Sequence, residues 1–311
     1  MKDLQDVRPA FIDRPGGPRL CPCGLSFLVP EHYGRRSDFA RCQRCGLVFS
    51  ADMPPEEELA RWYREEHWIR YSDEQIGMAR TNVYVHAWSW LEELSLIPGV
   101  LVDVGCGAGT LLALCRDRGW KGMGFDPSIQ AAAYARARGL EVHAEAFPPC
   151  SLADATADAL TFINVLDHLR NPFGALEEAW RVLREGGLLY IRVPNGPFHL
   201  AMLSLLSVVR LDYLAVFHLY GFGRASFQYH LPRLGFEILA IRTAPPSQGN
   251  AYDWGGRRAA LAARLLKLVD QAAYRVLKGL GLTRMAWGPS IEVMARKRRS
   301  GPIGPEHRGA R

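Results

Sequence analysis

A glycine-rich turn is the segment of this sequence whose composition points most directly to ligand binding. Gly105, Gly107 and Gly109 alternate with small residues directly after the apolar run 100–104. Glycine lets the backbone turn tightly and approach a ligand, and a helix that begins at 110 would offer unpaired N–H groups. The alternative is a plain tight turn whose small residues serve packing alone.

The spacing of this turn separates it from other nucleotide-binding loops. A dinucleotide fingerprint needs G-x-G-x-x-G and a Walker loop needs Gly-Lys-Ser/Thr, whereas this turn reads G-x-G-x-G and continues with Thr110. Asp103 lies two residues before the turn, and Asp126 ends the next apolar run. A carboxylate at 126 can accept from both ribose hydroxyls, or it can cap the helix that follows. The tight turn beside Asp103 favours a ligand with a cationic amine and a sulfonium over a pyrophosphate.

Two later segments carry histidines suited to proton transfer. His168 follows Asp167 just past the apolar run 158–164. The usual pKa of histidine suits removal of a proton near neutrality, and Asp167 can polarise the ring. His218 and Tyr220 are further catalytic candidates, because an aromatic ring can also face a cation. The alternatives are a structural role for the first histidine and core packing for the second pair.

Four of the seven cysteines cluster near the N-terminus, in Cys21-Pro-Cys23-Gly and Cys42-Gln-Arg-Cys45-Gly. The second pair has the C-x₂-C-G spacing of a zinc-ribbon knuckle, and the first pair is one residue shorter. Four thiolates would fill the coordination of zinc, so a zinc ion here would be structural. His32 is a substitute ligand, and a ribbon that keeps its fold without metal is the alternative.

The elements that position these groups follow from the hydrophobic pattern. From residue 100 onward, short apolar runs alternate with helical patterns, which predicts an α/β domain with a doubly wound, mostly parallel sheet. Helices are expected at 110–118, 128–138 and 172–184. Strands are expected at 100–104, 121–126, 140–143, 158–164, 187–193, 235–242 and 290–297.

The remaining segments suggest how the chain is organised around this domain. We expect a flexible leader, a small zinc-ribbon-like module, a helical and aromatic-rich connector or lid, the main domain and a basic tail. An apolar insert and a basic amphipathic helix interrupt the main domain. The leader is 1–19, the zinc-ribbon-like module 20–50, the connector 51–99, the main domain 100–297 and the basic tail 298–311. Within the main domain, the apolar insert is 198–217 and the basic amphipathic helix is 257–279.

Charge is distributed unevenly along the chain. The net charge is +6, but residues 255–311 hold 13 basic and 3 acidic residues, so the preceding part is mildly acidic. This makes a nucleic-acid partner unlikely for the body of the protein. The helix 257–279 combines a basic face with an aliphatic stripe, which suits peripheral contact with anionic lipid or docking on the main domain. No apolar run is long enough to cross a bilayer and no secretory signal is recognised, so we expect a cytoplasmic protein, with contact at the inner membrane surface.

Together, three stretches resemble the class I S-adenosylmethionine (SAM)-dependent methyltransferases: VDVGCGAGTLL, GFDPS and DALTFINVLDHLRNPFGALEEAWRVLREGGLLYIRVPN. HLYGFGRASFQYHLPRLGFEIL resembles the family's segment before its sixth strand. The resemblance covers about 100–297. It implies a Rossmann-like sheet of seven strands in the order 3-2-1-4-5-7-6, with the seventh antiparallel, and it places the HLYGF segment on the acceptor side.

The resemblance also implies which residues hold SAM. Glu145 is a candidate for the adenine amine, with a solvated loop acid as the alternative, and Asn164 is a candidate for the amino-acid end or a plain turn residue. The full cofactor set is Asp103, Gly105, Cys106, Gly107, Gly109, Asp126, Pro127, Glu145 and Asn164.

The function expected from the resemblance is methylation of a small molecule. Methyltransferases with such a ribbon occur in bacterial sugar and cell-surface polysaccharide pathways, and in a ribosomal RNA group. We therefore expect in-line transfer to an oxygen, and less readily to a carbon, of a sugar or lipid-linked saccharide. A ribosomal RNA methyltransferase that docks through the ribbon and a non-enzymatic SAM-binding protein are the alternatives.

Overall fold

The computed structural model describes residues 21, 23, 28–33, 36–50, 53–76, 80–94, 98–208, 218–248 and 257–299. The predicted leader 1–19 lies outside these ranges. Residues 300–311 of the basic tail and residues 209–217 of the apolar insert also lie outside them.

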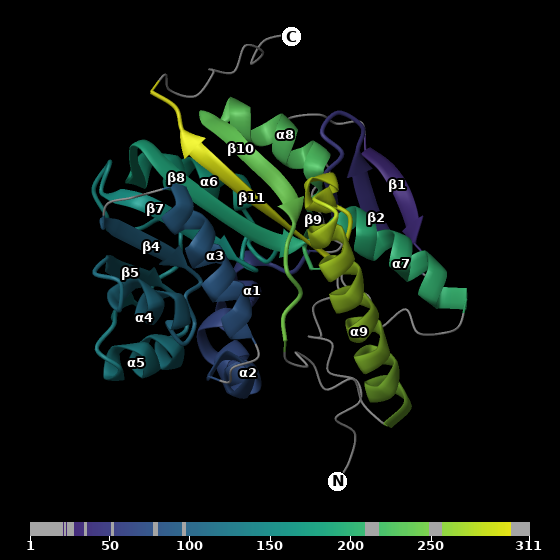
Figure 1. The fold of residues 1–311 in the computed structure, drawn as a ribbon, viewed down its shortest axis with the longest axis horizontal. Coiled ribbons are helices and arrows are strands. Elements are labelled where there is room, and N and C mark those ends of the chain that lie inside the picture. The colour runs from purple at the N-terminus through teal and green to yellow at the C-terminus, as the bar shows by residue number, and fades with distance from the viewer. Residues whose placement is uncertain are drawn as a thin grey trace.

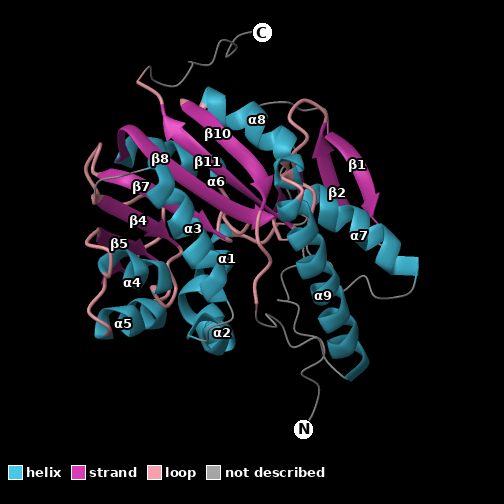
Figure 2. Ribbon diagram, viewed as in Figure 1, coloured by secondary structure: helices cyan, strands magenta, loops and turns pink. Residues whose placement is uncertain are grey.

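The centre of the molecule is a seven-stranded sheet in the order β10-β11-β8-β7-β4-β5-β6 (Figures 1 and 2). Strand β11 pairs antiparallel with both β8 and β10, and the other neighbours are parallel. This confirms the predicted order 3-2-1-4-5-7-6. The strands are β4 (Val100–Val104), β5 (Lys121–Phe125), β6 (Glu141–His143), β7 (Ala157–Ile163), β8 (Leu183–Pro194), β10 (Phe236–Thr243) and β11 (Ser290–Lys297).

Helices cover both faces of this sheet, as the alternating pattern predicts. On one face lie α3 (Thr81–Leu94), α4 (Thr110–Arg116) and α5 (Ile129–Ala137), and on the other lie α6 (Pro172–Val182) and α8 (Arg224–Arg233). Every residue of β7 is buried. A strand covered on both faces reads as a continuous apolar run, which is why the sequence pattern located it.

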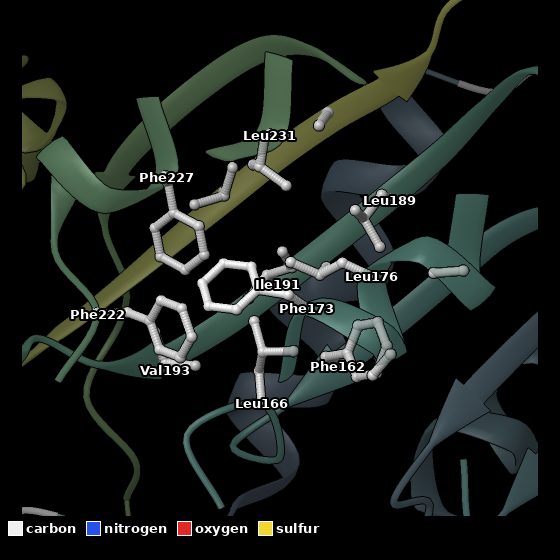
Figure 3. Packing of buried hydrophobic residues seen from close by; sticks show 14 of the residues in the cluster. Phe162, Leu166, Phe173, Leu176, Leu189, Ile191, Val193, Phe222, Phe227 and Leu231 are labelled. Carbon is white, nitrogen blue, oxygen red and sulfur yellow. The ribbon is translucent and has the colours of Figure 1, made fainter. Parts of the chain in front are cut away.

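The core on the α6 and α8 face is rich in aromatic side chains. Figure 3 shows Phe162 of β7 and Ile191 of β8 pointing toward Phe173 of α6 and Phe227 of α8. Phe222, just before α8, stacks on Phe227 with ring centroids 5.1 Å apart. This core holds the ends of β7 and β8 in fixed register.

A second, four-stranded antiparallel sheet carries the N-terminal cysteines. Its order is β1-β2-β3-β9, with β1 (Leu28–Tyr33), β2 (Arg36–Cys42), β3 (Val48–Ser50) and β9 (Tyr220–Gly221). The last strand belongs to the HLYGF segment of the main domain. Val48 pairs with Gly221 and Phe49 with Tyr220. The cysteine-bearing segment therefore shares a sheet with the main domain.

The first half of the predicted apolar insert forms helix α7 (Gly196–Val208). Leu200 and Leu203 on α7 pack against Phe39 and Val48 of the small sheet. In Figure 1, α7 lies beside β1 and β2, away from β4–β6. This part of the insert thus joins the small sheet to the carboxyl end of β8.

The predicted helical connector 51–99 contains α1 (Glu56–Arg61), a wider π-helical turn (Trp62–Glu66), α2 (His67–Ile76) and also α3, which packs on the main sheet. Three acidic residues occupy the first turn of α1, where they complement the helix dipole. Trp68 packs on Tyr134 of α5, with ring centroids 5.6 Å apart. Single π-turns recur at functional sites because they shift the direction of the side chains that follow.

Helix α9 (Arg257–Gly279) projects from the sheet (Figure 1). Its half-buried side is largely polar and includes Lys267, Asp270 and Tyr274. Its aliphatic stripe faces outward instead, with exposed fractions of 54–66% for a set of five residues: Leu261, Leu265, Leu268, Val269 and Val276. Among the described residues, no helix is long and apolar enough to cross a bilayer.

Candidate functional site

One cavity of about 550 Å³ opens at the carboxyl ends of β4, β5 and β7. This is the edge at which open α/β sheets bind ligands. Six of the residues predicted to hold cofactor line it: Gly105, Gly107, Asp126, Pro127, Glu145 and Asn164. The cavity continues past them to a chamber that contains His168 and His218.

The glycine turn wraps this cavity with a left-handed backbone. Gly105 has φ 68° and Gly107 has φ 51°, which other residues adopt only with strain. The Gly105 amide donates to the carbonyl of Phe125 at 2.7 Å. A Cβ atom on Gly105 would lie 2.3 Å from Cγ2 of Val165, so the turn is pressed against the segment after β7.

Asp126 faces the cavity and is held by backbone amides. Its Oδ2 accepts from the Gly107 amide and its Oδ1 from the Ser128 amide, both at 2.9 Å. Burial raises the pKa of this carboxyl. The N-cap of α5 is Ser128, whose Oγ accepts from the Ala131 amide. Ser128 therefore supplies the helix cap that was the alternative role for Asp126.

Three residues of the predicted cofactor set do not line the cavity. Asp103 is buried behind the turn, where its Oδ1 accepts from the Thr161 hydroxyl at 2.6 Å and burial raises its pKa to about 7. Cys106 is buried against the α3–α5 face, and Gly109 is the left-handed N-cap of α4. These three residues support the turn from the side away from the cavity. The chain reverses its direction there, between Gly105 and α4.

The two predicted residues that follow β6 and β7 do line the cavity. Glu145 lines it, and its Oε1 accepts from the Ser151 hydroxyl at 2.9 Å. Asn164 has φ 56°, a left-handed conformation that asparagine tolerates better than most residues. Its Oδ1 accepts from the guanidinium of Arg192 on β8.

The chamber is built around a buried carboxylate. Asp167 is 1% exposed, and the Nε2 atoms of His168 and His218 each lie 3.8 Å from its Oδ2. The two imidazole rings lie 3.8 Å apart between centroids. The hydroxyl of Tyr63, in the π-turn, shares a 2.7 Å hydrogen bond with Nδ1 of His168. The structure therefore brings together three of the four predicted catalytic residues.

Burial sets the charge of this cluster. Desolvation lowers the pKa of both His168 and His218 to about 3, and it raises the pKa of Asp167. Arg80 contributes further to the low values for both histidines. The near-neutral histidine pKa expected from the sequence is therefore not found: the side chains of His168 and His218 are 22% and 25% exposed, and this partial burial favours the neutral rings.

Tyr220, the fourth predicted catalytic residue, points elsewhere. Its hydroxyl donates to the Arg170 carbonyl at 3.0 Å, and its ring packs beside Phe49 and Phe222. It is 5% exposed and does not line the cavity. It is the first residue of β9 and pairs with Phe49 of β3, so core packing describes its place.

Several cavity residues were not singled out from the sequence. The aromatic richness of the connector was the available signal for some of them, but it did not show which residues face a ligand. The others come from elements that meet only through tertiary packing. The set includes Tyr63, His67, Tyr71, Arg80, Tyr84, Phe147, Arg192, His199, Lys267 and Asp270.

The four predicted metal ligands converge beneath the small sheet. Sγ of Cys21 lies 3.5 Å from Sγ of Cys45, Sγ of Cys23 lies 3.4 Å from Sγ of Cys42, and all four lie within 4.8 Å of one another. Zn–S bonds of about 2.3 Å in a tetrahedron separate sulfur atoms by about 3.8 Å. The donor set therefore fits zinc, and the short first knuckle does not prevent it. The side chain of His32 lies outside the described residues.

The domain family can be assigned from comparison with known proteins. Residues 84–241, just over half of the chain, match a family model described as a methyltransferase domain. The chain belongs to this methyltransferase family. SAM is the cofactor of such methyltransferases. The residues at the turn fit it, because Gly105 and Gly107 line the cavity with left-handed backbone and Asp126 presents a carboxylate at the cavity wall.

Curated relatives match part of the chain. An uncharacterized 37.1 kDa protein in a Streptomyces fradiae transposon is 34% identical over 61% of this chain and 52% of its own length. A probable SAM-dependent methyltransferase of Mycolicibacterium smegmatis is 28% identical, over 40% and 57%. A Pseudomonas putida ubiquinone biosynthesis O-methyltransferase is 28% identical, over 48% and 64%. The matches thus cover between about half and two thirds of these relatives.

Solved structures share the fold. A chain in the complex of the Haloferax volcanii Trm112 methyltransferase activator with a methyltransferase has a TM-score of 0.55 at 16% identity, over 76% of this chain and 98% of that one. A SAM-dependent methyltransferase from Thermotoga maritima has a TM-score of 0.50 at 17% identity, over 76% and 100%. At this identity the likeness concerns architecture alone.

The contact between Gly105 and Val165 yields a prediction about cofactor binding. Gly105→Ala adds a Cβ that clashes with Val165 and strains a left-handed backbone. We expect SAM affinity to fall at least tenfold, about 1.4 kcal/mol or more, by isothermal titration calorimetry. Gly119→Ala is the matched control, since Gly119 has φ 77° but no atom within 4 Å of the place that a Cβ would take. The Gly119→Ala variant carries only backbone strain and should keep its affinity for SAM. Equal losses of SAM affinity in both variants would contradict the role given to Val165.

Proposed function

We propose that the protein transfers the methyl group of SAM to a hydroxyl oxygen of a small acceptor, a sugar or lipid-linked saccharide of cell-surface polysaccharide or related biosynthesis. The observation that carries this proposal is the continuity of one cavity. The cradle of Gly105, Gly107 and Asp126 and the chamber of His168 and His218 line the same space. A cofactor in the cradle and an acceptor in the chamber would meet there.

The chamber has the chemistry to orient a hydroxylated acceptor. Its walls combine the phenol groups of Tyr63 and Tyr71, neutral imidazoles and the charged groups of Arg80, Lys267 and Asp270. Donors and acceptors that surround a polyol fix its orientation through many hydrogen bonds. A cavity of about 550 Å³ admits one small molecule or the end group of a larger one beside a cofactor.

The residues of this chain contribute mainly by position. SAM supplies an activated methyl carbon when it is bound. Because transfer requires the acceptor oxygen to approach that carbon in line, alignment of the two molecules accounts for much of the rate. Neutral His168 and His218 can accept hydrogen bonds from an acceptor hydroxyl, and helices α1 and α2 exclude water from one side of the chamber.

The partner proposed for α9 is an anionic membrane surface. Its outward stripe of Leu261, Leu265, Leu268, Val269 and Val276 is flanked by exposed basic residues, among them Arg264, Arg275 and Lys278. The opposite side brings Lys267 and Asp270 to the cavity. An aliphatic stripe flanked by cations is typical of helices that lie in the lipid interface. A saccharide carried on a lipid could then enter the cavity while its chain stays in the bilayer.

We infer that Cys21, Cys23, Cys42 and Cys45 hold a structural zinc ion. Three of the four are buried, and the fourth is half-buried. The hydrogen bond between Cys21 and Cys45 lowers the pKa of the Cys45 thiol, which is the direction that metal binding needs. A site filled by four thiolates has no open position for substrate, which leaves zinc to stabilise the β1-β2-β3-β9 sheet.

The proposed reaction predicts where a methyl label goes. With methyl-labelled SAM and fractionated cell extract, we expect label in the lipid-linked saccharide or soluble sugar fraction, stable to base as an ether is. Label in RNA would replace this proposal with an RNA methyltransferase. Measurable SAM binding with no label in any fraction would point to a SAM-binding protein without transferase activity.

The zinc site predicts one equivalent of tightly held metal. Cys45→Ser removes one of four ligands, so we expect zinc measured by atomic absorption to fall from about one equivalent to well below half. The thermal unfolding midpoint falls with it, because metal binding stabilises only the folded chain. Cys115→Ser is the control, since Cys115 is a buried cysteine of α4 outside the cluster. Zinc-free wild-type protein purified without chelators would contradict the assignment.

The membrane proposal predicts loss of lipid binding when the stripe becomes acidic. The double change Leu265→Glu and Leu268→Glu removes apolar contact and adds repulsion from anionic lipid, so flotation with phosphatidylglycerol vesicles falls at least tenfold. Ile129→Glu is the matched control, because Ile129 is 59% exposed on α5, away from α9. Unchanged flotation of the double variant would show that α9 does not make the membrane contact.

A further inference from the structure

The carboxylate at the centre of the chamber lacks hydrogen bonds. Both side-chain oxygens of Asp167 are buried, and neither has a hydrogen-bond partner within the described ranges. A buried carboxylate left in this state costs several kcal/mol unless another group compensates it. The nearest polar atoms, Nε2 of His168 and Nε2 of His218, stand 3.8 Å from Oδ2. That distance is too long for a hydrogen bond, so the three groups face a common point without bonding to one another.

The spacing of these three atoms suits a metal ion. Ligand nitrogen and oxygen atoms at about 2.0–2.2 Å from a metal lie roughly 3.0–3.4 Å apart for octahedral or tetrahedral angles. Asp167, His168 and His218 offer one ligand atom each, and these atoms all lie within 4.8 Å of one another. A shift of a few tenths of an ångström in each side chain would close the site around an ion.

Tyr63 supplies the outer support that such a site needs. Its hydroxyl bonds to Nδ1 of His168 at 2.7 Å, on the side of the ring opposite Nε2. When Nδ1–H donates to the Tyr63 hydroxyl oxygen, Nε2 is unprotonated and available to the metal, and the bond fixes the orientation of the ring. The ring of His168 is therefore already turned with Nε2 toward Asp167.

We propose that Asp167, His168 and His218 bind a divalent transition-metal ion at the acceptor end of the cavity. Two imidazoles and one carboxylate suit manganese, iron, cobalt or zinc better than magnesium, which prefers oxygen ligands. Three protein ligands leave coordination positions open, and His168 and His218 line the cavity through which an acceptor would arrive. This site is separate from the four cysteines, whose thiolates fill a zinc ion completely.

The use of the ion rests on the proposed function. An acceptor hydroxyl bound to the ion becomes more acidic: its O–H bond breaks, the electron pair stays on the oxygen and the proton passes to water. The oxygen is then a better nucleophile and is fixed in place.

The test is direct binding of Mn²⁺ to the full-length protein, without SAM or acceptor. Manganese is read by the loss of its free-ion electron paramagnetic resonance signal, and it does not compete well for four thiolates. We expect one Mn²⁺ per chain. Asp167→Asn and His218→Gln should each weaken binding roughly 100-fold or more, and Tyr63→Phe about tenfold, as loss of an outer-sphere partner does.

His199→Gln is the matched control, because His199 lines the same cavity but bonds to the Pro289 carbonyl at 2.8 Å. Its Mn²⁺ affinity should equal that of the wild type. Calorimetry with SAM checks that each variant is folded. The proposal is overturned if Mn²⁺ does not bind and if added Co²⁺ gives no visible absorption other than the bands of Co²⁺ bound to thiolates. Equal Mn²⁺ affinity in wild type, Asp167→Asn and His218→Gln overturns it as well. Neither result depends on methyl transfer, so failure of the metal site and failure of the proposed function are distinguishable.

Discussion

The close contact between the glycine turn and the end of β7 is the constraint on which the site depends. Gly105 has no room for a side chain because Val165 fills the space beside it, and its amide is held by the carbonyl of Phe125. The segment that carries Val165 continues directly into Asp167 and His168. One packing contact therefore sets the distance between the cofactor cradle and the chamber, and neither half of the cavity can move without the other.

The sheet was predictable because its signals are local. Buried parallel strands read as short apolar runs, and left-handed turns require glycine, so the strands and the cradle followed from these signals, whereas the strand order came from the resemblance to the methyltransferases. The chamber was less predictable because its walls come from distant elements. Tyr63 meets His168 across 105 positions of sequence, and Lys267 reaches the cavity from α9. Tyr220 shows the opposite limit: the motif placed it near the site, but its pairing with Phe49 and its hydrogen bond to the Arg170 carbonyl hold it in the core.

Burial also changed the chemistry expected from residue type alone. A histidine beside an aspartate suggests a base, but His168 and His218 lose hydration and their pKa falls to about 3. The same desolvation raises the pKa of Asp167. Sequence identifies which groups are present, whereas their protonation depends on how much water the fold leaves around them.

The two-residue strand β9 has a consequence for attempts to divide the molecule. It completes the cysteine-bearing sheet through Phe49, and the amides of Leu219 and Tyr220 both donate to the Asp167 carbonyl. A shortened protein that began at β4 would remove Phe49 from the ring of Tyr220 and leave β9 with no edge to pair with. The cysteine-bearing sheet is thus an integral part of the fold and not an appended module. We do not expect the methyltransferase domain to fold by itself once this sheet is removed.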